Sequence, residues 1–292
     1  MRSGFCAIVG RPNVGKSTLL NAIVGQKVAI TTPVPQTTRH AVRGVLHRDD
    51  LQIVFVDTPG IHKPRTLLGS RLNEVARGAL SGVDCIVFMV DGERGIGRGD
   101  AFLAKLLADV DTPVIAVVNK VDRLRKVDQL PRLAAVAELG DWDEIVPVSA
   151  LTGEGVGVLV DLLAERMPEG PAYFPPGQVT DQTPEQLVAE IVREKAIMLM
   201  REEVPHSIAV VVDEITPGER EGVLVVSATI YVERESQKGI VIGKGGSVLR
   251  QIGSKARPEL ELVLGAKVFL DLRVKLAKEW QRDPKKLERL GY

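Results

Sequence analysis

The chain has little of what marks secreted or membrane proteins. Its 292 residues include only two cysteines. Cys6 and Cys85 each lie in an apolar run of strand length, which predicts buried, reduced thiols and a cytoplasmic location. No apolar stretch approaches the ~20 residues needed to span a bilayer. A run that predicts a strand begins at Phe5, which leaves no room for a signal peptide.

Aromatic residues and net charge are also scarce. Phe, Trp and Tyr make up 4% of the residues, and 38 Lys and Arg balance 38 Asp and Glu. The hydrophobic content of 45% and the charged content of 26% are those of a globular protein. The length exceeds the ~100–200 residues usual for one domain. We therefore expect two domains, 1–167 and 182–292, joined by a Pro- and Gly-rich linker at 168–181.

The most informative motif is the glycine loop Gly10-Arg11-Pro12-Asn13-Val14-Gly15-Lys16-Ser17, which fits the phosphate-binding P-loop pattern. It follows an apolar run at 5–9 and precedes the apolar spacing of a helix from Thr18. This order points backbone N–H groups and a helix N-terminus at one anionic site. Lys16 is expected to reach the β- and γ-phosphates, and Ser17 to bind Mg²⁺. A glycine turn without a ligand is the alternative.

A second motif selects the base. Asn119-Lys120-Val121-Asp122 follows the apolar run 114–118, so it lies at the carboxyl end of an expected strand, where ligands bind in open α/β sheets. The Asp122 carboxylate can accept hydrogen bonds from N1–H and the N2 amine of guanine, which adenine lacks. Asn119 can donate at the base edge or to neighbouring loops, and the stem of Lys120 can lie along the purine face. A surface turn in which Asp122 caps a helix is the alternative.

Two shorter motifs end further strands. In Asp57-Thr58-Pro59-Gly60, Asp57 can hold Mg²⁺ through water, and the Gly60 N–H can sense the γ-phosphate. In Ser149-Ala150-Leu151, the Ala150 N–H can contact guanine O6. The complete predicted nucleotide-binding set is Gly10, Arg11, Pro12, Asn13, Val14, Gly15, Lys16, Ser17, Thr18, Asp57, Asn119, Lys120, Asp122, Ser149, Ala150 and Leu151.

Together the four motifs resemble the G1, G3, G4 and G5 boxes of the translation-factor-like GTPases, over about residues 4–167. Switch I is expected in the Thr- and Pro-rich loop 26–40, where Gln36-Thr37-Thr38-Arg39 resembles the signature of the Era and TrmE group. One of Thr37 and Thr38 should bind Mg²⁺ in the GTP state. We favour Thr38, so that the predicted metal-binding residues are Ser17, Thr38 and Asp57. A solvated loop without metal contact is the alternative.

The catalytic groups differ from those of Ras-like GTPases. Ras-like proteins place a water-orienting Gln after the G3 glycine, where this chain has Ile61. In the Era and TrmE group a P-loop Asn helps to bind K⁺ where an arginine finger would act, and Asn13 matches it. The resemblance implies a slow, K⁺-stimulated GTPase in which Asn13, Lys16, Thr38 and Gly60 act in catalysis. The alternative is that Asn13 only forms the loop turn.

The remaining apolar patterns predict two kinds of domain. In the first, strands and helices alternate, which predicts an α/β fold with a mostly parallel sheet covered on both faces. After Asp57 we expect helices near 68–80, 100–108, 130–138 and 156–165, and strands at 85–90, 114–119 and 145–148. In the second we expect a helix capped by Thr183 and reaching about Glu203, strands at 207–214 and 222–232, helices at 248–252 and 258–264, and a strand at 267–274.

The second domain carries a G-x-x-G loop, Gly243-Lys244-Gly245-Gly246, between two helical pieces. The αββααβ order with this loop resembles a type II KH domain, an α+β fold. In that module the loop backbone approaches nucleic-acid phosphates, and a groove holds about four single-stranded nucleotides. The predicted RNA-binding residues are Gly239, Ile240, Val241, Ile242, Gly243, Lys244, Gly245, Gly246, Ser247 and Arg250. A glycine turn between helices is the alternative.

The distribution of charge favours a nucleic-acid ligand. Residues 182–237 carry five Lys or Arg and eleven Asp or Glu, whereas residues 238–292 carry thirteen Lys or Arg and six Asp or Glu. The basic charge is thus concentrated around the G-x-x-G loop, where Lys238, Lys255 and Arg257 add to the loop's own cations. Because aromatics are few, recognition should rest on backbone and base-edge hydrogen bonds. A solvated basic face is the alternative.

The C-terminal stretch 275–290 has the pattern of a basic amphipathic helix. Ala277, Trp280 and Leu287 form its apolar side, and Pro284 is expected to break it. We favour packing on the sheet of the second domain, with contact to RNA or a membrane surface as the alternative.

A GTPase domain followed by a KH domain is the arrangement of the Era family of bacterial GTPases, and the resemblance covers nearly the whole chain. It implies Mg²⁺ with GTP or GDP, K⁺ as a further cation, binding near the 3′ end of 16S ribosomal RNA, assistance to assembly of the 30S subunit, and some peripheral membrane association. We expect a monomer and no DNA partner.

Nucleotide state is expected to control RNA binding. GTP would order residues 26–39 and the loop after Asp57, and hydrolysis would release both. Two other functions stay open. One is an RNA-binding module in which nucleotide is a structural ligand. The other is a metabolic P-loop kinase, which the Asn119–Asp122 motif opposes.

Overall fold

The chain forms two units in the computed structural model, which describes residues 1–35, 37–60, 64 and 66–292. Unit 1 comprises Met1–Ala29, Thr38–Arg65 and Gly69–Asp181. Unit 2 comprises Ile30–Thr37, Thr66–Leu68 and Gln182–Tyr292. Two short segments from the first part of the sequence therefore group with the C-terminal residues, which the sequence does not predict.

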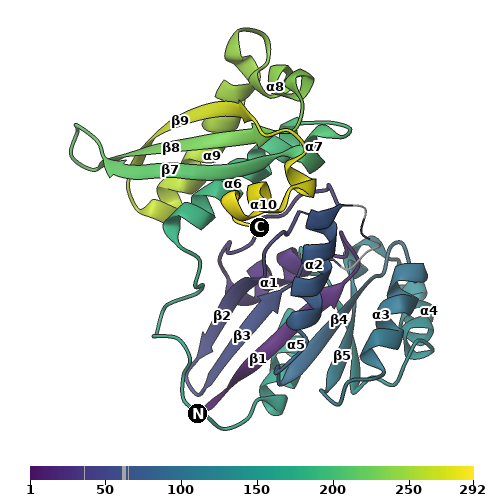
Figure 1. The fold of residues 1–292 in the computed structure, drawn as a ribbon. Coiled ribbons are helices and arrows are strands. Elements are labelled where there is room, and N and C mark those ends of the chain that lie inside the picture. The colour runs from purple at the N-terminus through teal and green to yellow at the C-terminus, as the bar shows by residue number, and fades with distance from the viewer. Residues whose placement is uncertain (36, 61–63, 65) are drawn as a thin grey trace. The chain divides into compact units, whose positions relative to one another are not determined.

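Unit 1 is built on a six-stranded sheet in the order β2-β3-β1-β4-β5-β6 (Figure 1). Its strands are β1 (Arg2–Gly10), β2 (Val42–Arg48), β3 (Leu51–Asp57), β4 (Cys85–Asp91), β5 (Val114–Asn119) and β6 (Glu144–Val148). Its helices are α1 (Lys16–Val24), α2 (Leu67–Gly78), α3 (Arg98–Leu107), α4 (Lys126–Ala137) and α5 (Val156–Arg166), with a 3₁₀ turn η1 (Val121–Arg123). Neighbouring strands run parallel except β2, which is antiparallel to β3. The predicted mostly parallel sheet is confirmed.

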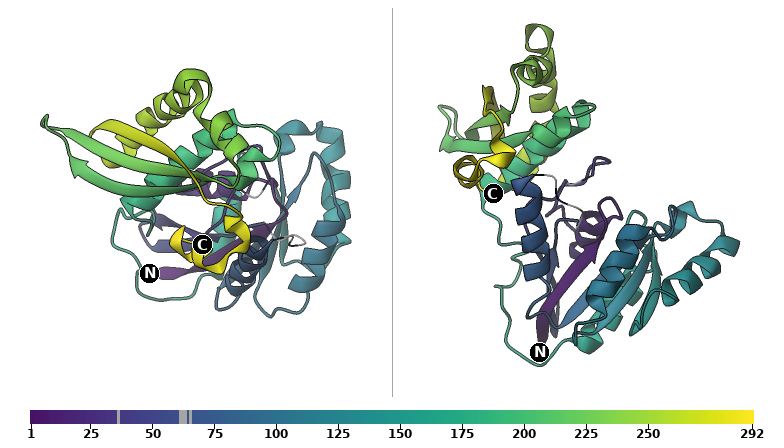
Figure 2. Two further views of the ribbon diagram at one scale, coloured as in Figure 1. Left: turned by 45° about the horizontal axis from the view of Figure 1, so that its top comes forward. Right: turned by 45° about the vertical axis from the view of Figure 1, so that its right-hand side comes forward.

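The inner strands β1, β3, β4 and β5 are buried over most or all of their length, whereas β2 and β6 also carry exposed residues. In β4, Cys85, Val87 and Met89 join a core with α1 and α5, whereas Ile86 and Phe88 join a second core with α2, α3 and α4. Helices thus cover both faces of the sheet (Figure 2). The carboxyl ends of the parallel strands meet at one edge, so the motifs that follow β1, β3, β5 and β6 come together there.

Strand β2 is not predicted from the sequence. Its residues, VRGVLHR, mix apolar, basic and glycine positions and give only imperfect alternation. They form a strand because each pairs with a residue of the strongly apolar β3. The pairing partner, rather than local propensity, determines the structure here.

The Pro- and Gly-rich stretch after α5 packs against unit 1 instead of forming a free tether. The Gln52 side chain of β3 accepts hydrogen bonds from the N–H groups of Tyr173 and Phe174 at 2.6 and 3.0 Å, and donates to the Phe174 carbonyl at 2.8 Å. The Val45 N–H of β2 donates to the Val179 carbonyl at 2.8 Å. This stretch is therefore an ordered strap along β2 and β3.

Unit 2 has a three-stranded sheet in the order β7-β8-β9. Its strands are β7 (Ala209–Pro217), β8 (Val223–Val232) and β9 (Lys267–Leu276), and its helices are α6 (Pro184–Leu199), α7 (Val204–Ser207), α8 (Glu235–Ile242), α9 (Ser247–Leu264) and α10 (Pro284–Arg289), with 3₁₀ turns η2 (Lys244–Gly246) and η3 (Trp280–Arg282). Helices α6 and α9 pack on each other and on the sheet around one apolar core (Figure 1). The Thr183 side chain caps α6 as predicted.

One predicted break in unit 2 is wrong. Residues 247–264 form the single helix α9, with Pro258 inside it, rather than two short helices. Ile252, Ala256 and Leu260 are all fully buried, so the apolar face continues across the proline. Burial of this face outweighs the backbone hydrogen bond that the proline removes.

The predicted C-terminal amphipathic helix is also wrong. Strand β9 continues to Leu276, and Pro284 begins the short helix α10 instead of breaking a longer one, because proline suits the first turn of a helix. Trp280 and Leu287 are nevertheless fully buried, and the Trp280 indole N–H donates to the Ser207 carbonyl at 2.9 Å. The apolar side of the tail packs within unit 2.

Among the described residues, no helix combines the length and the hydrophobicity that crossing a membrane requires.

Candidate nucleotide and RNA sites

The P-loop joins the end of β1 to the start of α1. Asn13 and Gly15 adopt left-handed backbone conformations, with φ of 64° and 104°. A Cβ added at Gly15 would lie 2.3 Å from the side-chain nitrogen of Asn119, and one at Gly10 would lie 2.6 Å from the Met89 carbonyl oxygen. Both positions require glycine because neighbouring groups press directly against the backbone.

Lys16 lies within the loop with its ammonium group enclosed. Its Nζ donates to the carbonyl oxygens of Gly10 and Arg11, each at 3.0 Å. Burial lowers the pKa of Lys16 to about 8, and the Asp57 carboxylate opposes that shift. Phosphate anions at the loop would oppose it further, since a nearby negative charge favours the ammonium form. The lysine is thus placed to neutralise bound phosphate.

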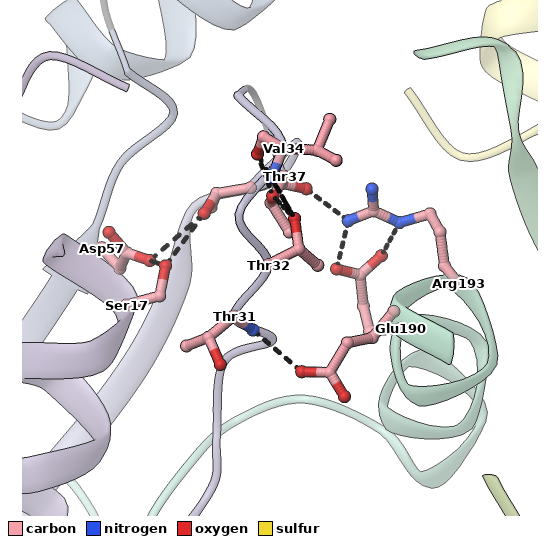
Figure 3. Close-up of polar contacts among 10 residues, drawn as sticks. Ser17, Thr31, Thr32, Val34, Thr37, Asp57, Glu190 and Arg193 are labelled. Atoms are coloured by element: carbon pink, nitrogen blue, oxygen red, sulfur yellow. Dashed lines mark hydrogen bonds and ion pairs between the residues drawn. The ribbon is translucent and has the colours of Figure 1, made fainter. Parts of the chain in front are cut away.

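Three oxygen-bearing side chains, those of Ser17, Thr38 and Asp57, converge at the start of α1, and Figure 3 labels the first and the last of them. Ser17 Oγ donates to Asp57 Oδ2 at 2.6 Å and lies 3.0 Å from Thr38 Oγ1, which is 3.5 Å from Asp57 Oδ2. Asp57 is fully buried, burial raises its pKa, and its Oδ1 has no hydrogen-bond partner among the described residues. Two hydroxyls and a carboxylate with a spare oxygen are the hard ligands that Mg²⁺ prefers. The predicted metal-binding residues therefore fit this ion.

The geometry distinguishes the two candidate switch threonines. Thr38 belongs to the oxygen cluster just described. Thr37 Oγ1 instead donates to the Val34 carbonyl at 2.8 Å and lies 2.5 Å from Thr32 Oγ1. Of the two, Thr38 is therefore in position to bind a metal. Gln36, which completes the switch motif, lies outside the described residues.

The base-recognition motif lies at the carboxyl end of β5. Asn119 donates to the Val14 carbonyl at 2.7 Å and accepts from the Ala150 N–H at 2.9 Å, so it ties the P-loop to the loop after β6. Of the two roles open to Asn119, the structure supports the loop contact. Asp122 Oδ1 accepts from the Ser149 hydroxyl at 2.7 Å, which orients the carboxylate. Leu151, in the same loop, is 73% exposed.

Lys120 has a partner that sequence reasoning misses. Its Nζ forms an ion pair with Asp91 Oδ2 at 2.6 Å and donates to the Asn13 carbonyl at 2.9 Å. Asp91 ends β4 in register with Asn119 at the end of β5. The available signal was its position, a carboxylate directly after a buried strand. Lys120 thus fastens the P-loop to the carboxyl edge of the sheet.

The G3 motif lies directly against the P-loop. A Cβ added at Gly60 would lie 2.7 Å from the Pro12 backbone nitrogen. The Thr58 hydroxyl donates to the Ile8 carbonyl at 2.9 Å and fixes the start of the turn. The Gly60 backbone is therefore near the loop that would hold phosphates. Ile61 lies outside the described residues.

The G-x-x-G loop of unit 2 joins α8 to α9. Gly243, Gly245 and Gly246 have φ of 72°, 58° and 77°. A Cβ at Gly243 would lie 2.5 Å from the Val248 side chain, whereas nothing lies within 4 Å of one at Gly245 or Gly246. The outer part of the loop is therefore open to a ligand. The exposed Lys244 lies in this outer part.

The predicted RNA-binding residues divide by burial. Ile240 is 51% exposed, whereas Val241 is fully buried and belongs to the core of unit 2. Arg250 is exposed, and its Nη2 donates to the Gly245 carbonyl at 2.9 Å, so the side chain lies along the loop. Val241 can contribute to the site only by packing in the core below the loop, and it cannot contact RNA directly.

Comparison with known proteins identifies both parts of the chain. A family described as 50S ribosome-binding GTPase matches residues 5–120, and the KH domain family matches residues 203–281. The chain is 54% identical to the GTPase Era of Mycobacterium tuberculosis H37Rv, covering 99% of this chain and 98% of that protein. It is also 54% identical to the GTPase Era of Mycobacterium avium, covering 100% and 99% of the two chains.

Solved structures agree with this assignment. The fold matches a crystal structure of Era in complex with MgGDPNP and nucleotides 1506–1542 of 16S ribosomal RNA, with a TM-score of 0.97, 44% identity, and coverage of 100% of this chain and 99% of that one. It matches Aquifex aeolicus Era bound to GDP·AlF4⁻ with the same TM-score, identity and coverage. The two domain families, in their order along the chain, and the full-length similarity establish that the chain belongs to the Era family of GTPases.

Proposed function

We propose that this GTPase is a guanine-nucleotide switch that binds the 3′ region of 16S ribosomal RNA through its KH domain and assists assembly of the 30S subunit. The observation that carries the proposal is the convergence of Ser17, Thr38 and Asp57 beside Lys16, on a chain that also has an open G-x-x-G loop. Residues 1–167 are assigned to the GTPase domain, 168–181 to the connection and 182–292 to the KH domain with its C-terminal extension.

Nucleotide recognition rests on the loops at the carboxyl edge of the six-stranded sheet. The P-loop backbone and Lys16 would hold the phosphates, while Ser17 and Thr38, and Asp57 through water, would hold Mg²⁺. A bound Mg²⁺ supplies charge that offsets the β- and γ-phosphates. Asp122, oriented by Ser149, accepts from guanine N1–H and N2. With adenine this desolvated carboxylate would be left unpaired.

Hydrolysis uses the same residues without a water-orienting glutamine. Lys16 offsets charge that develops on the phosphates, and the Gly60 N–H contacts the γ-phosphate. Asn13 would help to hold a K⁺ ion near the P-loop, and the ion would supply there the positive charge that an arginine finger supplies in other GTPases. Because no glutamine follows Gly60 to orient water, the reaction should be slow, and because the expected cation is exchangeable, the rate should depend on the salt present.

RNA binding is assigned to the G-x-x-G loop and the residues beside it. Gly245 and Gly246 leave the backbone accessible to phosphates, Lys244 and Arg250 add positive charge, and Ile240 offers an exposed apolar contact. GTP binding is proposed to change access to this surface through the switch segments. The protein acts in the cytoplasm as a monomer, with peripheral contact to the inner face of the membrane.

A turnover assay tests this function directly. Release of phosphate from GTP but not from ATP, with Mg²⁺ present, is the expected result. Replacing Asp122 with alanine should lower affinity for GTP by about 1,000-fold or more, since the carboxylate provides the discrimination. Equal hydrolysis of both nucleotides would exclude a guanine switch and favour a P-loop kinase.

A second candidate function keeps RNA binding and makes nucleotide a structural ligand. The residue after Gly60 favours it, since Ile61 cannot orient water. RNA affinity measured with a GTP analogue and with GDP separates the two. A ratio of one would support the structural role, and a several-fold difference would support the switch.

A further inference from the structure

The P-loop residue Arg11 has a side chain that reaches out of the loop to the turn between β4 and α3. Its Nη2 donates to the Gly95 carbonyl at 3.0 Å, and its Nε forms an ion pair with Asp100 Oδ2 at 2.7 Å. All three residues belong to unit 1. The guanidinium is therefore engaged by groups of the same unit that carries the phosphate loop.

Two glycines provide the space that this side chain fills. A Cβ added at Gly97 would lie 2.9 Å from Arg11 Nη1, and one at Gly99 would lie 2.6 Å from Arg11 Cδ. Gly97 has an ordinary extended backbone, with φ of −119° and ψ of 175°, so its conformation does not require glycine. The absence of a side chain instead lets the arginine lie directly against the backbone at the start of α3.

Arg11 supplies the positive charge beside a buried carboxylate. Asp100 is fully buried in the first turn of α3, where its Oδ2 also accepts from the Gly97 N–H at 2.8 Å. Among the described residues no other cation pairs with it, and its Oδ1 and Arg11 Nε make no directed hydrogen bond. The contact is therefore an ion pair held by charge. Because a buried carboxylate needs such a partner, it keeps the guanidinium in place.

The main chain of Arg11 connects this ion pair to the lysine of the P-loop, since Lys16 Nζ donates to the Arg11 carbonyl at 3.0 Å. We propose that Arg11 and Asp100 form a latch that positions the first half of the P-loop. Asp100 holds the arginine side chain, and the arginine in turn fixes the carbonyl that orients the Lys16 ammonium group. A loop fixed in this way loses less entropy when it binds phosphate. The inference rests on the proposed binding of nucleotide phosphates by this loop.

The second half of the P-loop is held by other residues. Asn119 donates to the Val14 carbonyl at 2.7 Å, and Lys120 donates to the Asn13 carbonyl at 2.9 Å. Both donors belong to the base-recognition motif, so a change at Arg11 leaves these contacts in place. The latch should therefore affect recognition of the phosphates and not that of the base.

The test compares the affinity of the full-length protein for GDP, with Mg²⁺ present, with its affinity for guanosine, which has no phosphate. Arg11→Met should weaken GDP binding about 10-fold and guanosine binding by less than about twofold, because only the phosphate loop is released. Displacement of a fluorescent GDP derivative measures both affinities. Arg11→Lys keeps a positive charge beside Asp100 and should recover part of the GDP affinity. Equal losses for GDP and guanosine would overturn the inference.

Asp100→Asn separates positioning by Arg11 from direct contact of its side chain with phosphate. The substitution removes the charge that holds the arginine, keeps an acceptor for the Gly97 N–H, and should also weaken GDP binding about 10-fold. Arg11→Met combined with Asp100→Asn should bind GDP about as weakly as either single variant, since both break the same pair. Unchanged GDP affinity in Asp100→Asn, or additive losses in the double variant, would overturn the latch.

Asp84→Asn is the matched control for loss of a carboxylate in unit 1. Asp84 directly precedes β4, at the end of the strand away from the P-loop, and its Oδ2 accepts from the Phe5 N–H at 2.7 Å. The substitution should lower the melting temperature and leave GDP affinity unchanged. An equal loss of GDP affinity in this control would overturn the inference, because destabilisation alone would then explain the loss in Asp100→Asn.

Failure of the latch and failure of the proposed function give different results. Wild-type protein that binds no guanine nucleotide would refute the proposed function, and the latch would be overturned with it. Wild-type protein that binds GDP, with an affinity that both Arg11→Met and Asp100→Asn preserve, would overturn the latch alone.

Discussion

The P-loop and the G-x-x-G loop are both glycine turns that lead into a helix, yet the outer glycines of the second loop, Gly245 and Gly246, have surroundings opposite to those of the P-loop glycines. A Cβ at Gly15 would lie 2.3 Å from the Asn119 amide, whereas one at Gly245 would have nothing within 4 Å. In the first loop the protein's own packing demands glycine. In the second the free space is available to a ligand. Substitution at Gly15 should therefore disturb packing and binding together, whereas substitution at Gly245 should cost only the backbone strain of its φ of 58° in addition to RNA binding.

The cations of the two loops differ in the same way. Lys16 is buried against loop carbonyls, and its pKa is lowered to about 8, whereas Lys244 is exposed. An enclosed cation suits one compact ligand of defined shape and charge. Exposed cations suit an extended polyanion, whose binding depends on salt.

Among substitutions in the two loops, the largest effect on ligand affinity and stability is expected at Gly15. Gly15→Ala should lower nucleotide affinity about 100-fold or more and destabilise the protein by about 2–4 kcal/mol, because the new Cβ meets Asn119 and the φ of 104° is unfavourable for alanine. Isothermal titration with GDP and thermal unfolding measure the two losses.

Gly25→Ala is the control for backbone strain without steric overlap. Gly25 has φ of 75°, and nothing lies within 4 Å of an added Cβ. It should cost about 1 kcal/mol of stability and leave nucleotide affinity unchanged. If the two variants behave alike, strain rather than packing explains the glycine at position 15.

The next effect is expected at Gly245. Gly245→Asp places a carboxylate where the phosphates of RNA would approach and should weaken RNA binding about 30-fold at low salt. Gly245→Asn is the matched variant, because asparagine tolerates positive φ as aspartate does and adds no charge. Both should unfold at nearly the same temperature. A loss of RNA affinity as large for asparagine as for aspartate would indicate that bulk, not charge, is responsible.

A third prediction asks whether Asn13 only forms the turn of the P-loop. Replacing Na⁺ with K⁺ should raise the GTP hydrolysis rate about 10-fold if a cation near Asn13 offsets charge on the phosphates. Asn13→Gly keeps the φ of 64° accessible while removing the side chain, and should abolish the difference between the two salts. Persistence of K⁺ stimulation in this variant would leave Asn13 with the turn alone.

The two loops also show which features of the site can be predicted from the sequence alone. The glycines, Lys16 and Asp122 follow from spacing, because a phosphate cradle and a base-selecting carboxylate need particular residue types at particular strand ends. Their partners do not follow from spacing. Asp91 joins Lys120 only because β4 and β5 are adjacent and in register.

The extent of helix α9 and the existence of strand β2 were harder to predict from the sequence, for a related reason. Pro258 predicts an interruption, but the buried face on either side of it continues through the helix. The residues of β2 carry a weak strand pattern and depend on β3 for pairing. Switch I was recognised from its threonines, whereas the hydrogen bond from Arg193 to the Thr37 carbonyl joins residues far apart in sequence and required the folded structure.

The smallest predicted effect concerns one exposed cation of the G-x-x-G loop. Arg250→Gln should weaken RNA binding only about 3- to 5-fold, but it should reduce the slope of log affinity against log salt by about one, as expected for one phosphate contact. Arg220→Gln removes the same charge from the β7–β8 hairpin, at the other end of β8 from α8, and should leave the slope unchanged. Equal slopes for both variants would mean that Arg250 acts through its bond to the Gly245 carbonyl, shaping the loop rather than neutralising RNA. The open loop would then depend on internal packing, as the P-loop does, and the contrast between the two would be narrower than their glycines suggest.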